Sequence, residues 1–209
     1  MLSPSGSRMM RFRDLCIVVL ALAVWASGSL AQMPRPSIFA YGGGSLPLAP
    51  SKFSDYWRPG YILGGGFGND IRPNLSISLQ LEYMKFPINN KKVKILYGAS
   101  NLSGGSASLT MLSINWKARL EPKPKPFSPY ILFGGGFIIL QRSDLLVFYE
   151  DSYGNMESSS EGALALDAGV GFEWISARNL GFFVDSRFIM GFTHGEQTRL
   201  LPIRMGILL

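Results

Sequence analysis

One histidine and a run of serines are the residues whose types could catalyse a reaction in this 209-residue chain. His194 lies near Glu196, and Ser158, Ser159 and Ser160 stand in the preceding polar stretch. A serine beside a histidine base can act as a nucleophile in acyl transfer, so a lipid-modifying enzyme is one alternative function. No local signature links these residues, and one histidine among scattered carboxylates shows no metal-ligand spacing. We therefore expect no catalytic residue, no metal and no cofactor.

A basic run is the second candidate. Lys91, Lys92 and Lys94 stand in a stretch without acids between Pro87 and Leu109. Two interpretations stay open: the lysines are merely solvated, or they bind lipopolysaccharide phosphates or an external polyanion electrostatically. The next long polar stretch has the opposite charge, with Arg142 among the acids Asp144, Glu150, Asp151, Glu157 and Glu161.

Charged residues also stand at alternate positions inside otherwise apolar segments. If these segments are strands, the charges share one face, and four acids would face four bases across an enclosed space. Balanced charge favours a filled interior with paired groups over a channel lined by one sign. The eight residues are Glu82, Lys117, Arg119, Asp167, Glu173, Asp185, Arg187 and Arg204.

The segments that carry these charges alternate with a period of two. The clearest is 74–86, in which Leu75, Ile77 and Leu79 oppose Ser76 and Ser78. Only an extended strand separates such a pattern into two faces. Repeated to the end of the chain, the pattern predicts an all-β fold: an eight-stranded antiparallel up-and-down transmembrane β-barrel, apolar side outward. The expected strands are 37–44, 60–69, 74–86, 107–120, 127–141, 162–174, 180–192 and 199–209.

The connections between the expected strands alternate in length. Residues 45–59, 87–106 and 142–161 form long polar loops, whereas 70–73 and 175–179 form tight turns. Aromatic residues should form two bands where the barrel crosses the membrane interfaces. The expected interface residues are Trp116, Trp174 and Tyr130 at one rim and Phe86 and Phe192 at the other.

Three glycine triplets occur, at 42–44, 64–66 and 134–136. A phosphate-binding loop would need a helix to follow each one, and none is indicated. We interpret the triplets as places where large inner side chains approach a strongly bent wall.

The first 31 residues have the features of a secretory signal peptide. Three arginines precede the apolar segment 15–25, and Ser29 to Ala31 supply small residues before the expected first mature residue, Gln32. Residues 32–209 would then form one barrel domain. Cleavage removes Cys16, the single cysteine, and lowers the net charge from +6 to about +4, which is no argument for nucleic-acid binding.

The chain resembles the small eight-stranded outer-membrane barrels of the outer-membrane protein A, opacity-protein and X-type adhesin group. The resemblance rests on the signal, the runs 128–137 and 168–174, and the alternating C-terminal strand. One departure is the last residue, Leu209, where such chains usually end in an aromatic residue read by the barrel-assembly machinery.

The resemblance implies a monomer at the cell surface, in the outer membrane of a Gram-negative bacterium. Its implied partners are outer-membrane lipid, lipopolysaccharide and the barrel-assembly machinery. A non-enzymatic structural or adhesin-like role through the loops follows, with an unidentified extracellular ligand. A narrow pore for small solutes is the alternative.

Overall fold

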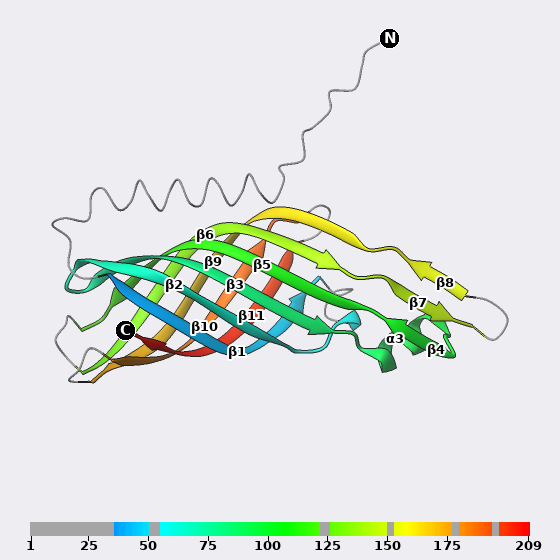
Figure 1. The fold of residues 1–209 in the computed structure, drawn as a ribbon, viewed down its shortest axis with the longest axis horizontal. Coiled ribbons are helices and arrows are strands. Elements are labelled where there is room, and N and C mark those ends of the chain that lie inside the picture. Colours follow the sequence, from blue (N-terminus) through cyan, green and yellow to red (C-terminus); the bar gives the residue numbers. More distant parts are fainter. Residues whose placement is uncertain (1–35, 51–54, 122–125, 150–152, 177–179, 194–196) are drawn as a thin grey trace, which may run out of the picture. The chain divides into compact units, whose positions relative to one another are not determined.

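The computed structural model describes residues 36–50, 55–121, 126–149, 153–176, 180–193 and 197–209. Within these residues, eight long antiparallel strands form a closed barrel, and pairing of the first with the last closes it (Figure 1). The barrel strands are β1 (Ser37–Ala49), β2 (Gly60–Arg72), β3 (Leu75–Pro87), β5 (Ser106–Arg119), β6 (Phe127–Arg142), β9 (Ser159–Ile175), β10 (Gly181–Gly191) and β11 (Thr198–Leu208). The predicted barrel is confirmed, whereas the predicted signal peptide lies outside the described residues.

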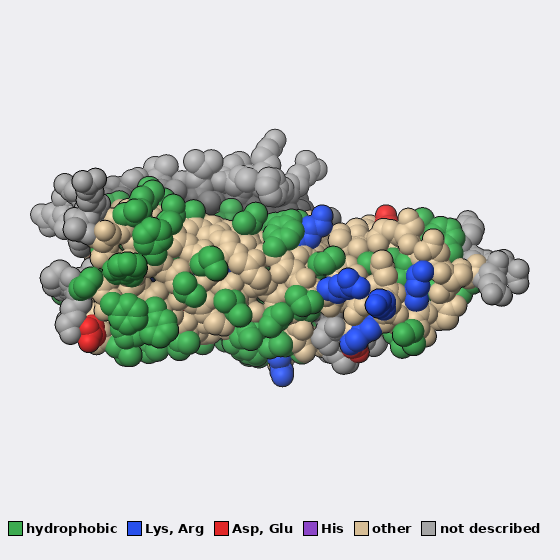
Figure 2. Space-filling view, turned by 90° about the horizontal axis from the view of Figure 1, so that it is seen from below, with side chains coloured by type: hydrophobic (Ala, Val, Ile, Leu, Met, Phe, Trp, Pro, Cys, Tyr) green, Lys and Arg blue, Asp and Glu red, His purple; other side chains and the backbone are tan. Residues whose placement is uncertain are grey.

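Alternating side chains give each barrel strand two different faces. In β10, Phe182, Val184 and Phe188 are exposed, whereas Asp185 and Arg187 are buried. Hydrophobic side chains accordingly cover much of the barrel surface seen in Figure 2. A belt of exposed apolar residues of this extent is suited to lipid, so the wall is built to cross a membrane.

The glycine triplets lie inside β1, β2 and β6. A Cβ atom at Gly64 would lie 2.6 Å from the ring of Tyr41, and one at Gly66 would lie 2.9 Å from the ring of Phe39. These contacts confirm that glycine leaves room for large inward-pointing side chains.

A second, smaller sheet was not predicted, because 87–106 and 142–161 were expected to be loops. It consists of β4 (Asn101–Gly104), β7 (Leu145–Phe148) and β8 (Tyr153–Met156), in the order β4-β7-β8. Together with helix α3 (Asn90–Tyr97) it forms what we call the platform, at the opposite end of the barrel from the C-terminus (Figure 1). Strands of four residues are too short for alternation to reveal them.

Local sequence sets both ends of α3. The side chain of Asn89 accepts a hydrogen bond from the backbone N–H of Lys92 at 3.4 Å, which caps the first turn. Gly98, with φ of 61°, ends the helix in the left-handed conformation that glycine adopts without strain. None of the helices in the described part of the chain is long and apolar enough to cross a membrane.

The half of the barrel interior next to the platform is apolar. Nine large apolar side chains fill most of it, and each is at most 1% exposed, so water does not reach them. We call this set the apolar plug: Ile62, Met84, Phe86, Leu109, Met111, Ile138, Leu140, Ile189 and Leu200.

Candidate functional site

The eight predicted charged residues all point into the barrel interior. They come from β3, β5, β9, β10 and β11, and each stands on the inward parity of its strand. Among these eight side chains, that of Lys117 is the most accessible, at 20% exposed. The side chains of Glu82, Glu173 and Arg187 are fully buried. They lie together in the half of the barrel interior that is farther from the platform, beyond the apolar plug.

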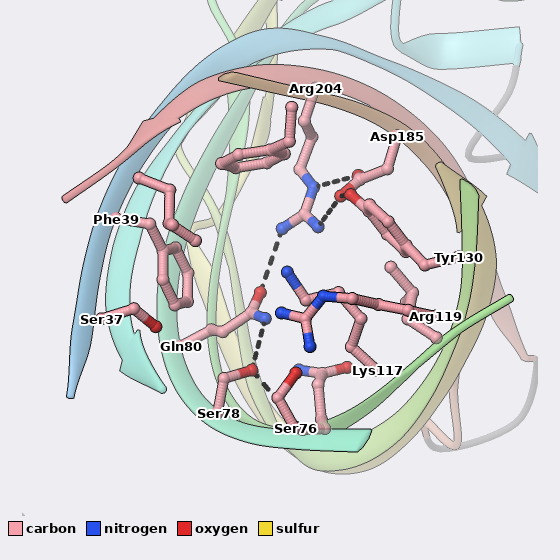
Figure 3. A pocket seen from close by; sticks show the side chains of 14 residues that line it. Ser37, Phe39, Ser76, Ser78, Gln80, Lys117, Arg119, Tyr130, Asp185 and Arg204 are labelled. Carbon is pink, nitrogen blue, oxygen red and sulfur yellow. Dashed lines mark hydrogen bonds and ion pairs between the residues drawn. The ribbon is translucent and has the colours of Figure 1, made fainter. Parts of the chain in front are cut away.

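Arg204 is central to this group. Its guanidinium donates from Nε to Asp185 Oδ1 and from Nη2 to Asp185 Oδ2, both at 2.7 Å. Its Nη1 donates to Glu82 Oε1 at 2.6 Å and to Gln80 Oε1 at 3.0 Å (Figure 3 shows the contacts with Asp185 and Gln80). The guanidinium carbon also lies 4.3 Å from the ring centroid of Tyr41. A bidentate pair of this kind fixes geometry as well as charge.

Arg187 connects two acids. It donates to Glu82 Oε1, which also accepts from the Tyr41 hydroxyl at 2.6 Å, and to Asp167 Oδ1 at 3.4 Å. Glu82 Oε1 is therefore shared by two guanidinium groups. Such sharing offsets the cost of taking a carboxylate out of water.

A second pair of bases lies nearer the C-terminal end. Lys117 donates to Glu173, and Arg119 donates to Glu173 at 3.4 Å and to Asp70 at 3.0 Å. Asp70 was predicted to lie in a turn, but β2 continues to Arg72 and carries Asp70 into the wall. Sequence reasoning therefore missed this fifth acid.

A small void remains beside these groups. Its volume is about 40 Å³, and Ser76, Gln80, Lys117, Arg119 and Tyr130 are among its lining residues (Figure 3). A void of this size has room for a few water molecules, since one water molecule needs about 10 to 15 Å³ of such space.

Every one of the four predicted acids contacts a base, and every predicted base contacts an acid. Carboxylates paired in this way are poorly placed to exchange protons with a substrate. The arrangement is that of a filled barrel.

We expect the refolded protein to show no steady conductance in planar bilayers, because the apolar plug and the paired charges occupy the lumen. Single-channel recording at moderate salt measures this directly. Large, stable channels from the unmodified protein would contradict the prediction.

Two of the predicted interface aromatics are wrong. Phe86 and Tyr130 are 0% and 3% exposed, because each shares the inward parity of its strand and points into the lumen. Trp116, Trp174 and Phe192 face outward, at 37%, 61% and 46% exposed. Parity alone could have corrected Phe86, since it stands four residues after Glu82. Outward aromatics that were not among the predicted residues include Tyr83, Phe133 and Phe172.

The predicted polyanion contacts Lys91, Lys92 and Lys94 all lie on α3. Lys92 Nζ lies 2.8 Å from Asp55 Oδ1, and Lys94 Nζ donates to the carbonyl of Ser100 at 2.9 Å. The Lys92 pair is more than half exposed on both sides, so it is weak and can be exchanged for another anion.

Only some of the residues considered for catalysis lie within the described part of the chain. His194 and Glu196 lie outside the described residues. Ser158, Ser159 and Ser160 border a shallow hollow of about 490 Å³ together with Ser108 and Gln141, among others. In the described ranges, no group of three or more His, Cys, Asp or Glu residues could hold a metal ion.

No family model and no curated protein matches this sequence. Solved structures do match its fold. Neisserial surface protein A matches over 83% of this chain and 96% of its own, with 12% identity and a TM-score of 0.54. A major outer membrane protein from Thermus thermophilus matches over 84% and 98%, with 14% identity and a TM-score of 0.52.

The attachment invasion locus protein of Yersinia pestis matches over 85% of this chain and 100% of its own, with 14% identity and a TM-score of 0.49. The first two likenesses show that the chain has the fold of small outer-membrane β-barrels.

Proposed function

We propose that the chain is a non-enzymatic barrel of the outer membrane of a Gram-negative bacterium, with a structural and surface-interaction role. The observation that carries this proposal is the platform, which has an apolar core of its own. Val93 of α3 packs there with Leu145 and Val147 of β7, all at most 6% exposed. A loop that served only as a connection would need no such core.

The filled lumen supports this proposal over a narrow pore. The proposed partners are outer-membrane lipid, lipopolysaccharide and the barrel-assembly machinery, with the chain acting as a monomer. Interaction beyond the membrane would use the platform, on which α3 presents its lysines. Figure 2 shows Lys and Arg side chains gathered toward the end at which Figure 1 places α3 and β4.

Replacing Lys91 and Lys92 by Gln is expected to weaken binding of dextran sulfate, a soluble polyanion, roughly fivefold at low salt, because two exposed charge contacts at about 0.5 kcal/mol each are lost. Lys94 is left in place because it holds the Ser100 carbonyl. Binding to the folded protein in zwitterionic nanodiscs can be measured by biolayer interferometry at low salt and at 1 M salt. At 1 M salt the Debye length falls to about 3 Å, so charge contacts are screened.

Arg72→Gln is the matched control, since Arg72 is an exposed base at the opposite end of β2 from the platform side. It should leave binding unchanged. Equal affinity of the wild type and the double lysine variant at low salt would remove the basis for a polyanion-binding platform.

A further inference from the structure

The hollow bordered by Ser158, Ser159 and Ser160 has an entirely polar lining. It lies over the neighbouring strands β5, β6 and β9 (Figure 1). Six serines line it together with Gln141 and Arg142, and among the described residues no apolar or acidic one does. Small-molecule sites have volumes of about 300 to 1,000 Å³ and are usually mostly apolar. This hollow, of about 490 Å³, offers hydroxyl, amide and guanidinium groups instead, which suit a hydroxyl-rich and anionic ligand.

One row of outward residues connects the hollow with Lys85. Ser108 of β5 pairs with Gln141 of β6, and Gln141 pairs with Ser160 of β9. On its other side, Ser108 pairs with Lys85 of β3. All four residues share the parity of the lipid-facing residues of their strands. Since Cβ atoms of directly opposite residues are about 4.5 to 5.5 Å apart, the long side chain of Lys85 reaches the edge of the hollow.

The same row marks the end of the apolar belt on the platform side. Followed from the opposite end of the barrel, Lys85, Gln141 and Ser160 are each the first outward residue of their strand that is not apolar, aromatic or glycine. Tyr61, directly opposite Lys85 on β2, is 47% exposed, as is usual for a tyrosine at a membrane interface. The apolar belt of such a wall ends where the hydrocarbon of the bilayer ends. The hollow therefore lies at the level of the headgroups of the surrounding leaflet.

The charges that border the hollow favour an anionic group. Lys85 and Arg142 are exposed, and within the described ranges neither side chain forms a hydrogen bond or an ion pair. Glu161 stands on the inward parity of β9 and so faces away from the outer wall. Asp144 and Glu157 are exposed acids next to the platform strands, but neither lines the hollow, and the carboxylate of Asp144 accepts a backbone hydrogen bond at 2.5 Å. Two bases thus border the hollow, and none of these three acids does.

We propose that this hollow binds the headgroup of a phosphorylated glycolipid in the surrounding leaflet. The ammonium group of Lys85 binds a phosphate, and Ser108, Gln141 and Ser160 form hydrogen bonds with sugar hydroxyls. The acyl chains lie along the apolar belt next to the hollow. A soluble sugar phosphate would forgo these apolar contacts. The inference rests on the proposed outer-membrane function and names the lipid that the wall binds, at a site that is separate from the lysines of α3.

The test titrates the full mature chain, folded in amine-oxide micelles, with lipid A, a phosphorylated glycolipid. This detergent contains neither sugar nor phosphate, so it does not compete for the hollow. Native mass spectrometry counts the bound lipid. Phosphatidylglycerol, which has a phosphate but no sugar, and glucosamine 1-phosphate, which has no acyl chain, are the comparison probes.

The informative variant combines Lys85→Gln with Gln141→Leu, which removes the charge and the amide with little change in side-chain size. Arg199→Gln is the matched control, because Arg199 is an exposed base near the platform end of β11, and β11 lies across the barrel from β5. Retained heat-dependent gel mobility shows that each variant is folded.

We expect the wild type to bind lipid A roughly tenfold or more tightly than either comparison probe. The double variant should bind lipid A roughly tenfold more weakly than the wild type does. It loses one charge contact and one amide hydrogen bond, each of which contributes roughly threefold to the affinity. Arg199→Gln should bind lipid A as the wild type does.

Equal lipid A affinity of the wild type and the double variant overturns the inference, and so does an equal loss of affinity in Arg199→Gln. Binding of either comparison probe as tightly as lipid A overturns it too, because the sugar or the acyl chains would then contribute nothing. A wild type that binds dextran sulfate but no lipid A overturns the glycolipid site and leaves the polyanion-binding platform standing. Weakened lipid A binding by the double variant, in a protein that binds no dextran sulfate, supports the glycolipid site and overturns only the polyanion-binding platform.

Discussion

Replacing Arg187 by alanine is expected to lower the free energy of unfolding of the barrel by about 3 to 5 kcal/mol, the usual cost of removing one partner from a buried ion pair. Arg187 is 0% exposed and contacts both Glu82 and Asp167. Its loss removes a cation that neutralises the buried carboxylates of Glu82 and Asp167. Urea unfolding of the protein in lipid vesicles, followed by tryptophan fluorescence, measures the change.

Arg199→Ala is the matched control, because Arg199 is an exposed base on β11 and its truncation should change stability by less than about 0.5 kcal/mol. Arg187→Ala should also remain non-conducting. The apolar plug lies between the charged group and the platform, so removing the arginine opens no continuous path. An Arg187→Ala variant as stable as the wild type would show that the pairs contribute nothing to holding the wall.

Gly43→Ala is expected to destabilise the barrel by about 3 kcal/mol or to prevent folding, because overpacking against backbone cannot be relieved by a rotamer change. A Cβ atom at Gly43 would overlap the carbonyl oxygen of Ile203 on the neighbouring strand β11. The measurements are the fraction of protein with heat-dependent gel mobility and, where it folds, the urea midpoint.

The next residue supplies the control. At Gly44 the nearest atom to a new Cβ would be the carbonyl oxygen of Gly60, at 3.8 Å, which is ordinary van der Waals contact. Gly44→Ala should therefore change stability by less than about 0.5 kcal/mol. Equal effects of the two substitutions would mean that the triplet acts through chain flexibility and not through the space that each glycine leaves.

The number and direction of the barrel strands and the inward side of the charged residues were all predictable from the sequence. Each depends on a local property, because a period of two assigns every side chain of an extended strand to one of two faces. That is why Asp185 and Arg187 could be assigned to the lumen from β10 alone. Where glycine and apolar residues fill both faces, as in β1, the same rule gives no answer.

The platform and the apolar plug were decided by the tertiary structure. Ile62 and Ile138 are as apolar as the lipid-facing residues beside them, so only closure of the barrel determines which ones fill the lumen. The short strands of the platform become stable by packing Leu145 and Val147 against Val93, residues distant in sequence.

The pairing of the charges also needed the closed barrel. Glu82 of β3 and Arg187 of β10 are separated by 105 residues and lie on strands that are not neighbours in the wall. They meet because eight strands enclose a lumen narrow enough for opposite walls to touch. The sequence by itself determined which charges face inward, whereas the diameter and register of the closed barrel decided which acid meets which base, because contacts across the lumen depend on the positions of all eight strands together.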